Sequence, residues 1–251
     1  MKKIALFIVG FILWNFTLLG QNKMRPLKEL INTKEPAWTN FLQKWIKEAK
    51  NTVEILPKDS AKADSALYKS QVTTHSTMGA IVYETGGLLI DHGWIRILGS
   101  GSEKLGRNLM DWNKNKTYTN LGQQLPHLLI ADDILGGFFS INAGGLDTAN
   151  IGKVFYFAPG DLRWTCTGNT YTEFISFCLS CDLKKFYGTL YWNGWEKEIE
   201  SVNGNQGISC YPFLCTKEGK DINKDIRKVV PIEELWFLHN DLRKKFVMGE
   251  K

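Results

Sequence analysis

Two neighbouring carboxylates are the residues of this 251-residue chain whose types and spacing most directly suggest chemistry. Asp132 and Asp133 follow an apolar run, residues 128–131, and precede Gly136 and Gly137. Paired carboxylates can perform acid–base catalysis or bind a hard cation. Because adjacent residues of a strand point to opposite faces, both could serve one site only from within a turn. We favour the alternative that their oxygens accept hydrogen bonds from turn amides.

Histidine and serine supply the other candidate groups. His92 lies between Asp91 and Gly93, where a turn could orient it, but no Gly-x-Ser-x-Gly elbow accompanies it. Residues 99–102, Gly-Ser-Gly-Ser, follow a predicted strand as a phosphate loop would, yet the Gly-Lys-Ser/Thr ending is missing. We interpret these features as a turn histidine and a strand-ending loop, and His239 as a residue at the edge of the core. The sequence predicts no catalytic set, metal site or cofactor.

The cysteines leave three interpretations open. Cys178 and Cys181 have the spacing of a redox motif, but they fall near the end of a predicted helix. A reactive thiol pair is typical of a helix N-terminus, where the thiol pKa is lowered. No second Cys or His pair at zinc spacing is present. We favour buried free thiols over one structural disulfide, and either of these over a redox or metal role.

The elements that must position these groups follow from periodicity and turn signals. Apolar residues recur at helical spacing over residues 38–49, and a cap at Asp59 or Ser60 opens a second predicted helix that runs to residue 71. Residues 80–83, 87–90 and 94–98 are predicted as consecutive strands. The polar segment 106–124 is expected to be a surface loop that carries a short element.

The segment between Pro126 and Pro159 has the clearest strand pattern. Three apolar runs, residues 128–131, 138–141 and 154–157, are joined by glycine-rich turns. A capping box at residues 170–173 then starts a helix, and short helical pieces are predicted over residues 186–202. Residues 208–214 are predicted as the last strand, and a closing helix begins at Pro231. The predicted fold class is α+β, a central antiparallel meander with helices from both ends of the chain packed on it.

Composition restricts the class of protein. With 43% apolar and 12% aromatic residues, the chain can fill a sizeable core, and its nine tryptophans are spread along the sequence as core anchors would be. No repeat or linker divides residues 24–251, so we predict a single domain there. The formal charge of +5 is too small to indicate a nucleic-acid partner or an acidic membrane surface.

The first twenty residues are typical of a cleaved export signal. Lys2 and Lys3 precede an apolar run over residues 4–14, and Gly20 offers a cleavage position. The run is shorter than the roughly 20 residues that span a bilayer, so no membrane anchor is expected after cleavage. Removal of residues 1–20 deletes two lysines and no acids, which lowers the formal charge to +3. We predict a periplasmic or secreted protein, or a cytoplasmic one if Met24 is the true start.

Several blocks resemble a bacterial domain family of unknown function. They include Met24-Arg-Pro-Leu, Tyr83-Glu-Thr-Gly-Gly-Leu-Leu-Ile-Asp-His-Gly-Trp, the Ala-Asp-Asp block at residues 131–133, and Thr216-Lys-Glu-Gly-Lys-Asp. The resemblance runs from about Met24 to the last helix. Members of that family usually start near the position of Met24, so residues 1–23 depart from its pattern.

A more distant resemblance implies a function. Residues 126–157, with an apolar strand, Ala-Asp-Asp, Gly-Gly and aromatic strands, are similar to the SMI/KNR-like superfamily, abbreviated SUKH. Its members are α+β binding proteins, and many are immunity proteins that neutralise partner toxins. The resemblance implies a SUKH-like fold and a non-catalytic module, immune or regulatory, that uses its sheet and the 106–124 loop to bind an unknown protein.

The residues predicted to bind lie on these strands and their turn. Aromatic residues alternate along the strands, so some must face away from a one-sided core, where C-terminal helices cover them or a partner binds them. The predicted binding residues are Asp132, Asp133, Gly136, Gly137, Phe139 and Tyr156. The alternative is a cell-envelope hydrolase or metal-dependent enzyme that uses Asp132, Asp133 and His92. We favour the binding module.

Overall fold

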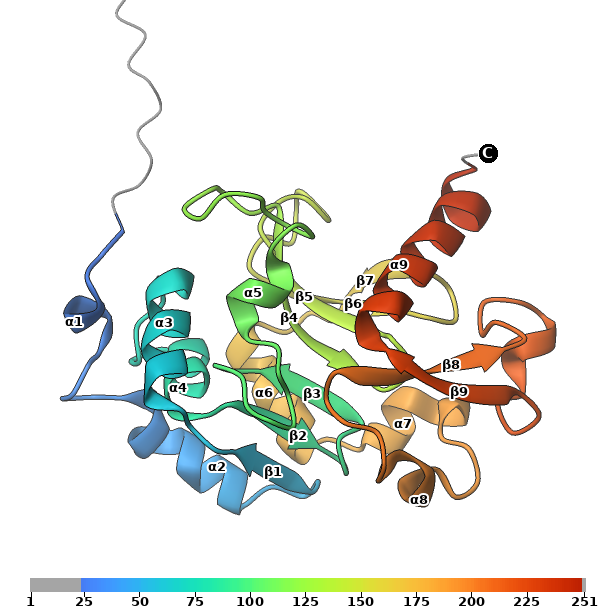
Figure 1. Ribbon diagram of the computed structural model, residues 1–251, viewed down its shortest axis with the longest axis horizontal. Helices are drawn as coiled ribbons and strands as arrows, with labels where there is room; N and C mark the ends of the chain where they lie inside the picture. Colours follow the sequence, from blue (N-terminus) through green and yellow to red (C-terminus); the bar gives the residue numbers. More distant parts are fainter. Residues whose placement is uncertain (1–23, 250–251) are drawn as a thin grey trace, which may run out of the picture.

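A seven-stranded antiparallel sheet forms the centre of the molecule (Figure 1). The computed structural model describes residues 24–249, so the predicted export signal, residues 1–20, lies outside the described residues. Each strand pairs with the next one in the chain, which is the predicted meander. The strands are β1 (Val53–Leu56), β2 (Gly87–Ile90), β3 (Ile95–Leu98), β4 (His127–Asp133), β5 (Phe138–Asn142), β6 (Val154–Ala158) and β7 (Arg163–Cys166). The predicted α+β class is therefore confirmed.

The register of the sheet assigns the candidate residues to two opposite faces. Asp132 lies opposite Arg96 on β3 and opposite Phe138 on β5, so these three side chains share the first face. Phe139 lies opposite Tyr156 on β6, and both belong to the second face. Side chains alternate along a strand, so Asp133 also faces the second side.

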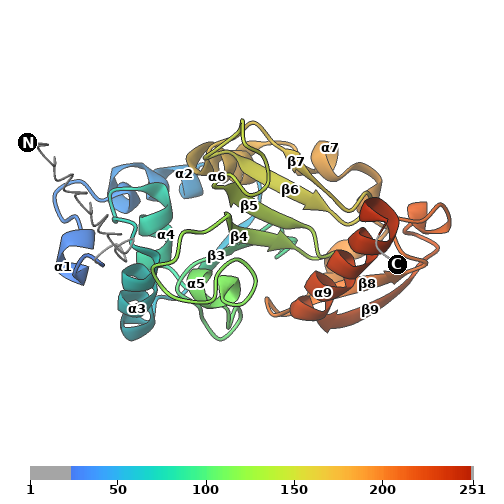
Figure 2. The same ribbon diagram turned by 90° about the horizontal axis from the view of Figure 1, so that it is seen from above.

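Helices cover both faces of the sheet (Figure 2). The helices α6 (Tyr171–Ser180) and α7 (Leu183–Tyr187) lie against the second face, where Phe174 packs 4.8 Å from Phe139 between ring centroids. The helices α5 (Leu109–Asn113) and α9 (Ile232–Arg243) lie against the first, where Trp236 packs 4.9 Å from Phe138. The sheet is therefore a central layer with both faces covered, rather than an open binding face.

The N-terminal helices stand at the β1 end of the sheet. They are α1 (Leu27–Leu30), a π-helical turn (Trp38–Leu42) that continues into α2 (Gln43–Lys47), α3 (Ser60–Ser70) and α4 (Thr77–Glu84). The two helices predicted in this region are confirmed, and Asp59 caps α3 by accepting a hydrogen bond from the Lys62 amide at 3.1 Å. The Thr170 capping box of α6 is present as predicted.

One predicted strand was wrong, and two strands were missed. Residues 80–83 form part of α4 rather than a strand, because Ser76 caps the helix at the Gly79 amide and residues 77–82 are all buried. A continuous run of apolar residues has no hydrophobic periodicity by which a helix could be distinguished from a strand. Strand β7 was not predicted, and the predicted last strand, β8 (Gln206–Tyr211), is followed by β9 (Ile226–Pro231).

The segment 106–124 was predicted to be a surface loop with a short element; that element is α5, and it enters the core. Leu109, Trp112 and Asn113 of α5 are buried. The Asn113 side chain donates to the Leu129 carbonyl at 2.7 Å and accepts from the Leu129 amide at 2.8 Å. These bonds satisfy backbone groups at the irregularity in the β4–β5 register.

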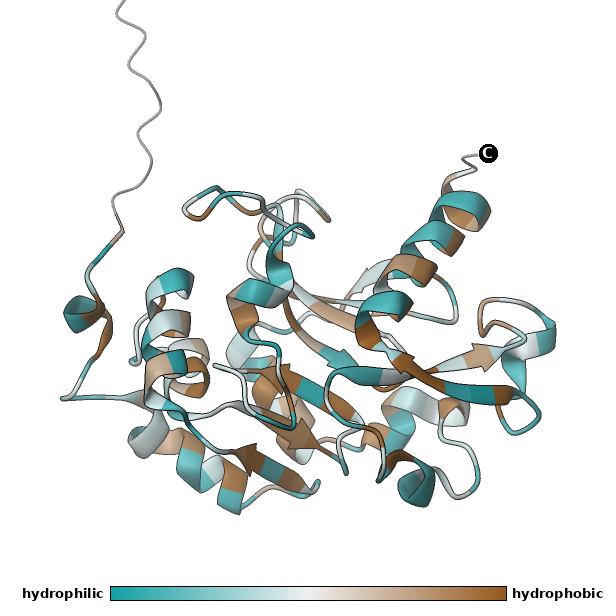
Figure 3. Ribbon diagram, in the orientation of Figure 1, coloured by the Kyte–Doolittle hydropathy of each residue, from teal (hydrophilic) through white to brown (hydrophobic). Residues whose placement is uncertain are grey.

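The last part of the chain forms a separate layer, which we call the C-terminal unit (residues 206–249). Strands β8 and β9 make a two-stranded hairpin, and α9 with the π-helical turn Lys244–Met248 crosses it. Both occupy one end of the molecule in Figures 1 and 2. In Figure 3 hydrophobic and hydrophilic residues alternate along α9, as expected for a helix with one buried side. The short helix α8 (Trp195–Ile199) precedes this unit.

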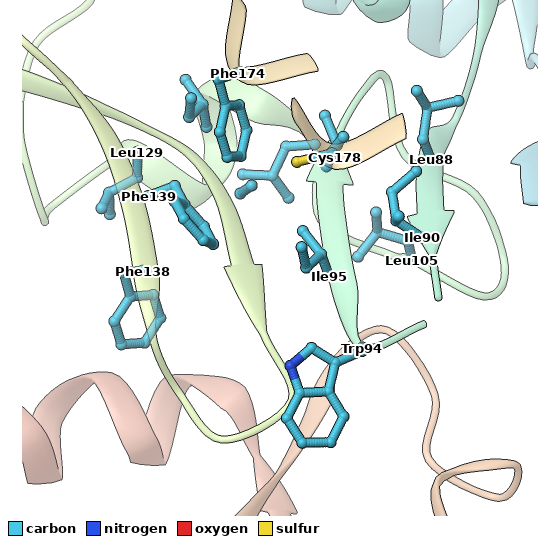
Figure 4. Close-up of a cluster of buried hydrophobic side chains, with 14 of the residues drawn as sticks. Leu88, Ile90, Trp94, Ile95, Leu105, Leu129, Phe138, Phe139, Phe174 and Cys178 are labelled. Atoms are coloured by element: carbon cyan, nitrogen blue, oxygen red, sulfur yellow. The ribbon is translucent and has the colours of Figure 1, made fainter. Parts of the chain in front are cut away.

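A single cluster of buried apolar side chains extends from Leu30 to Leu242. Figure 4 shows part of it, where Trp94, Phe139 and Phe174 lie among aliphatic residues of β2, β3 and β4. Trp94, Trp192 and Trp195 are buried, which agrees with the interpretation of the tryptophans as core anchors. Among residues 24–249 no helix has the length and apolar character needed to cross a membrane.

Candidate functional site

The turn between β4 and β5 is built around the Asp133 carboxylate, which is fully buried. One oxygen accepts the amide hydrogens of Leu135 at 3.0 Å and Gly137 at 2.8 Å, and the other accepts the Tyr156 hydroxyl at 2.7 Å. Burial raises the pKa of Asp133, while the bonds from Tyr156 and Gly137 oppose that rise. Asp133 therefore holds turn amides, as favoured from the sequence.

The two glycines of this turn are required by close approach. A Cβ atom at Gly137 would lie 2.1 Å from the nearer Asp133 oxygen and 2.5 Å from the Tyr156 hydroxyl. Gly136 has a φ of +76°, and a Cβ there would meet the side chains of Leu235 and His239 on α9. The turn is therefore packed from both sides.

Asp132 points to the other face and binds two arginines. Its carboxylate accepts Arg96 Nε at 2.6 Å on one oxygen and Arg107 Nη1 at 2.5 Å on the other. Asp132 is fully buried, and the two arginine side chains are only 2% and 11% exposed. The interpretation that Asp132 accepts hydrogen bonds from turn amides is therefore wrong. We call Arg96, Arg107 and Asp132 the arginine–aspartate cluster.

The cluster also fixes the segment that enters the C-terminal unit. Arg96 donates to the Gln206 carbonyl at 2.6 Å and to the Asp133 carbonyl at 2.8 Å, and Arg107 donates to the Gly204 carbonyl at 2.5 Å. Burial lowers the pKa of Arg107, and the adjacent carboxylate opposes that change. Both arginines were missed in the sequence. The available signal was a charged residue within the apolar strand Ile95-Arg-Ile-Leu, since a buried charge needs a partner.

His92 lies elsewhere, on the exposed turn between β2 and β3. Its φ is +60°, and its backbone amide donates to Thr52 Oγ1 at 3.0 Å. Its neighbour Asp91 accepts the Tyr191 hydroxyl at 2.7 Å. A hollow of about 200 Å³ is lined by His92, Arg96 and Lys104, among others. The donors of Arg96 are used by Asp132 and backbone carbonyls, and neither Asp132 nor Asp133 lines this hollow, so it does not bring His92 together with the two predicted carboxylates.

The aromatic residues Phe139 and Tyr156 stack on each other, with ring centroids 4.6 Å apart. Phe139 is fully buried and Tyr156 is half-buried beneath α6 and α7. The predicted binding residues on this side, Asp133, Gly137, Phe139 and Tyr156, are thus brought together. Of the six predicted binding residues, only Tyr156 has substantial exposure, so a binding role for the set stays a prediction.

Two histidines are held neutral by burial. The pKa of His239 falls to about 4 because of burial, although a bond to the Gly136 carbonyl at 2.9 Å from Nδ1 opposes the fall. A carbonyl oxygen only accepts, so Nδ1 carries the proton. Burial also lowers the pKa of His127 to about 4. His239 is therefore the satisfied residue at the core edge that was predicted.

The cysteines are all free thiols in the structure. Cys178 is buried within α6, and burial followed by the nearby Cys181 raises its pKa well above the ordinary value. This shift opposes formation of a thiolate, which a redox centre would need. Within residues 24–249 no group of three or more His, Cys, Asp or Glu side chains is arranged to hold a metal ion.

Comparison with known proteins places the chain in a family. The chain is 42% identical over 210 residues to an uncharacterized protein of Haemophilus influenzae, which covers 84% of this chain and 91% of that protein. It is 38% identical over 223 residues to the putative uncharacterized protein YbfG of Escherichia coli K12, which covers 89% and 99% of the two chains. The model of a family described as "Protein of unknown function DUF2625" matches residues 27–235. The chain therefore belongs to the DUF2625 family, which agrees with the predicted bacterial family of unknown function.

Proposed function

We propose that this protein is a non-catalytic module that binds a protein partner through its C-terminal unit. The resemblance of residues 126–157 to the SMI/KNR-like superfamily supports a binding role, as an immunity or regulatory protein. The geometry at Asp132 and Asp133 gives the enzyme alternative no support. The two carboxylates face opposite sides of β4, and each is occupied by hydrogen-bond donors from the protein itself.

The observation that carries the proposal is the exposure of large apolar side chains on the C-terminal unit. Tyr211 and Ile226 lie directly opposite each other at the end of the hairpin that residues 212–225 connect, and Ile226 is 71% exposed. Phe246 (65% exposed) and Met248 are exposed at the end of the chain beyond α9. Exposed apolar side chains on projecting elements are typical of protein-binding surfaces.

The charges beside these residues indicate the kind of partner. Lys244 and Lys245 are exposed next to Phe246, and Lys228 is exposed on β9. Basic groups around apolar anchors fit a partner whose apolar groove is bordered by acidic side chains, which is the helix-in-groove mode of recognition. With the sheet covered on both faces, the C-terminal unit replaces the sheet as the expected contact surface. If residues 1–20 are cleaved for export, this partner is a protein of the cell envelope.

The test is co-purification from the native host after chemical cross-linking. We expect one protein to be recovered at about equal amounts with the wild-type chain. The double variant Ile226→Ser/Phe246→Ser should lose it, because both apolar anchors are removed from the surface. The matched control is Ile151→Ser, since Ile151 is 65% exposed but lies outside the C-terminal unit.

Two results would count against the proposal. One is recovery of no stoichiometric protein from the host, or equal recovery with wild-type and double variant. The other is retention of the wild-type chain on vesicles of anionic phospholipid with no protein partner, which would assign this basic and apolar surface to a membrane.

A further inference from the structure

A pocket of about 340 Å³ opens on the second face of the sheet, away from the C-terminal unit. It lies between β6 and β7 on one side and α6 and α7 on the other. Five of its lining residues are aromatic: Phe139, Tyr156, Phe174, Phe177 and Phe186. Its volume falls within the roughly 300–1,000 Å³ of small-molecule pockets.

The rings form a continuous aromatic wall. Phe186 of α7 is tilted against Tyr156 at 5.3 Å and stands edge-on to Phe177 at 5.2 Å between centroids. Phe139 is stacked on Tyr156 behind them. Phe186 is 38% exposed, so a large apolar ring borders the pocket in contact with solvent. Aromatic pairs prefer tilted or edge-on arrangements at such distances, and the rings that border the pocket can contact a further aromatic ring in the same way.

The wall is held in place from beneath. The Tyr156 hydroxyl donates to the buried Asp133 carboxylate, which in turn accepts two turn amides. This hydroxyl is engaged within the protein, so the tyrosine presents its ring rather than a polar group. A preformed, rigid site of this kind loses little conformational freedom when a ligand enters.

Polar groups border the pocket on its β7 side. Thr165, Thr167 and Asn169 belong to the lining. The Thr167 hydroxyl donates to the Val154 carbonyl at 2.8 Å. Within residues 24–249, no protein hydrogen bond engages the Thr165 hydroxyl or the Asn169 side-chain amide. These two groups are therefore available to a ligand.

We propose that this pocket binds a small aromatic compound of one or two rings that carries a single hydroxyl or amino group. The rings of Phe139, Tyr156 and Phe186 contact its apolar body, and Thr165 and Asn169 bind its polar end. This site is separate from the partner-binding surface proposed above, and either can exist without the other.

The test is calorimetric titration of the purified protein with 2-naphthol, which has the size and polarity described. Its saturated analogue, decahydro-2-naphthol, keeps the hydroxyl and the carbon skeleton but lacks the aromatic rings. We expect one saturable site for 2-naphthol and binding of the saturated analogue that is weaker by about tenfold. Phe186→Ala should weaken 2-naphthol binding by about tenfold, and Asn169→Ala by about threefold to tenfold.

The control variant is Phe237→Ala, which removes the same side chain from an exposed position of α9 and should leave binding unchanged. Circular dichroism verifies that each variant is folded. If Phe186→Ala fails to fold, Asn169→Ala and the saturated analogue still decide the question. The proposal is overturned if 2-naphthol shows no saturable binding, if its saturated analogue binds equally well, or if folded Phe186→Ala and Asn169→Ala bind it like the wild type. If a partner protein covers Phe186 and 2-naphthol does not bind, the pocket receives a side chain of that partner. This result would also overturn the proposal.

Discussion

Replacement of Asp132 by asparagine tests whether the carboxylate is a structural counter-ion. The substitution keeps the size of the side chain but removes the charge that two nearly buried guanidinium groups share. Breaking a buried ion pair from one side costs about 3–5 kcal/mol, because the remaining charge is left without a partner. Stability of a domain is in total about 5–15 kcal/mol, so Asp132→Asn should lose a large fraction of it.

The assay is urea unfolding at pH 7, followed by tryptophan fluorescence and circular dichroism. Two further variants give an expected order of effects. Arg107→Met should cost about 2 kcal/mol, because Asp132 keeps Arg96 and the main loss is the hydrogen bond to Gly204. Glu54→Gln should cost at most about 1 kcal/mol, since the Glu54–Lys104 pair is exposed.

Unfolding of Asp132→Asn at the same urea concentration as Glu54→Gln, with an unchanged slope, would contradict the role of Asp132 as a counter-ion. That role is also refuted if Arg107→Met is more damaging than Asp132→Asn, because the carboxylate would then not be the group that balances two cations. A stable Asp132→Asn protein would reopen the question of a functional role for this carboxylate.

Three further predictions concern the turn, the buried histidine and the leader. Gly137→Ala should lower the free energy of unfolding in urea by roughly 2–4 kcal/mol, because its Cβ would lie 2.1 Å from a buried carboxylate oxygen. Gly160→Ala is the control, since a Cβ there has only one atom near it, and it should change the free energy of unfolding by at most about 1 kcal/mol. His239 has a pKa of about 4 in the folded protein and 6.5 in the unfolded chain, so it should lower the free energy of unfolding by about 3 kcal/mol as the pH falls from 6.5 to 4. In His239→Asn the free energy of unfolding should depend less on pH over this range. The intact mass of the protein purified from its native host should correspond to a chain that begins at Gln21. A mass that corresponds to a start at Met24 would contradict export.

Strands β2 to β6 of the central sheet could be predicted because their signals are local. Residues 138–141 and 154–157 are short apolar runs bounded by glycine, and the capping box at Thr170 is a pattern within four residues. Strand β9 lacked such a signal, because three of its five residues before Pro231 are exposed and Lys228 lies within it. Its pairing with β8 is a tertiary preference that overrides local pattern.

The arginine–aspartate cluster could not be predicted because its members are distant in sequence. Arg96 and Arg107 are separated from Asp132 by 36 and 25 residues, and neither arginine belongs to a motif. Asp133 was interpreted correctly because its partners, Leu135 and Gly137, lie two and four residues away. Adjacent positions thus differed in predictability because one makes local bonds and the other makes long-range ones.

The Ala-Asp-Asp block therefore connects the two outer layers of the molecule through one strand end. Asp132 holds the arginines that bind the carbonyls of Gly204 and Gln206 at the entry to the C-terminal unit. Asp133 holds Tyr156, which forms part of the aromatic pocket beneath α6 and α7. Both sets of contacts stabilise the fold, so the block can be typical of a fold without indicating a reaction. The two proposed binding surfaces lie on opposite faces, and a ligand in the pocket can influence partner binding if it shifts this strand end. Such coupling would appear as equal changes in the two affinities, since linkage between binding sites is reciprocal.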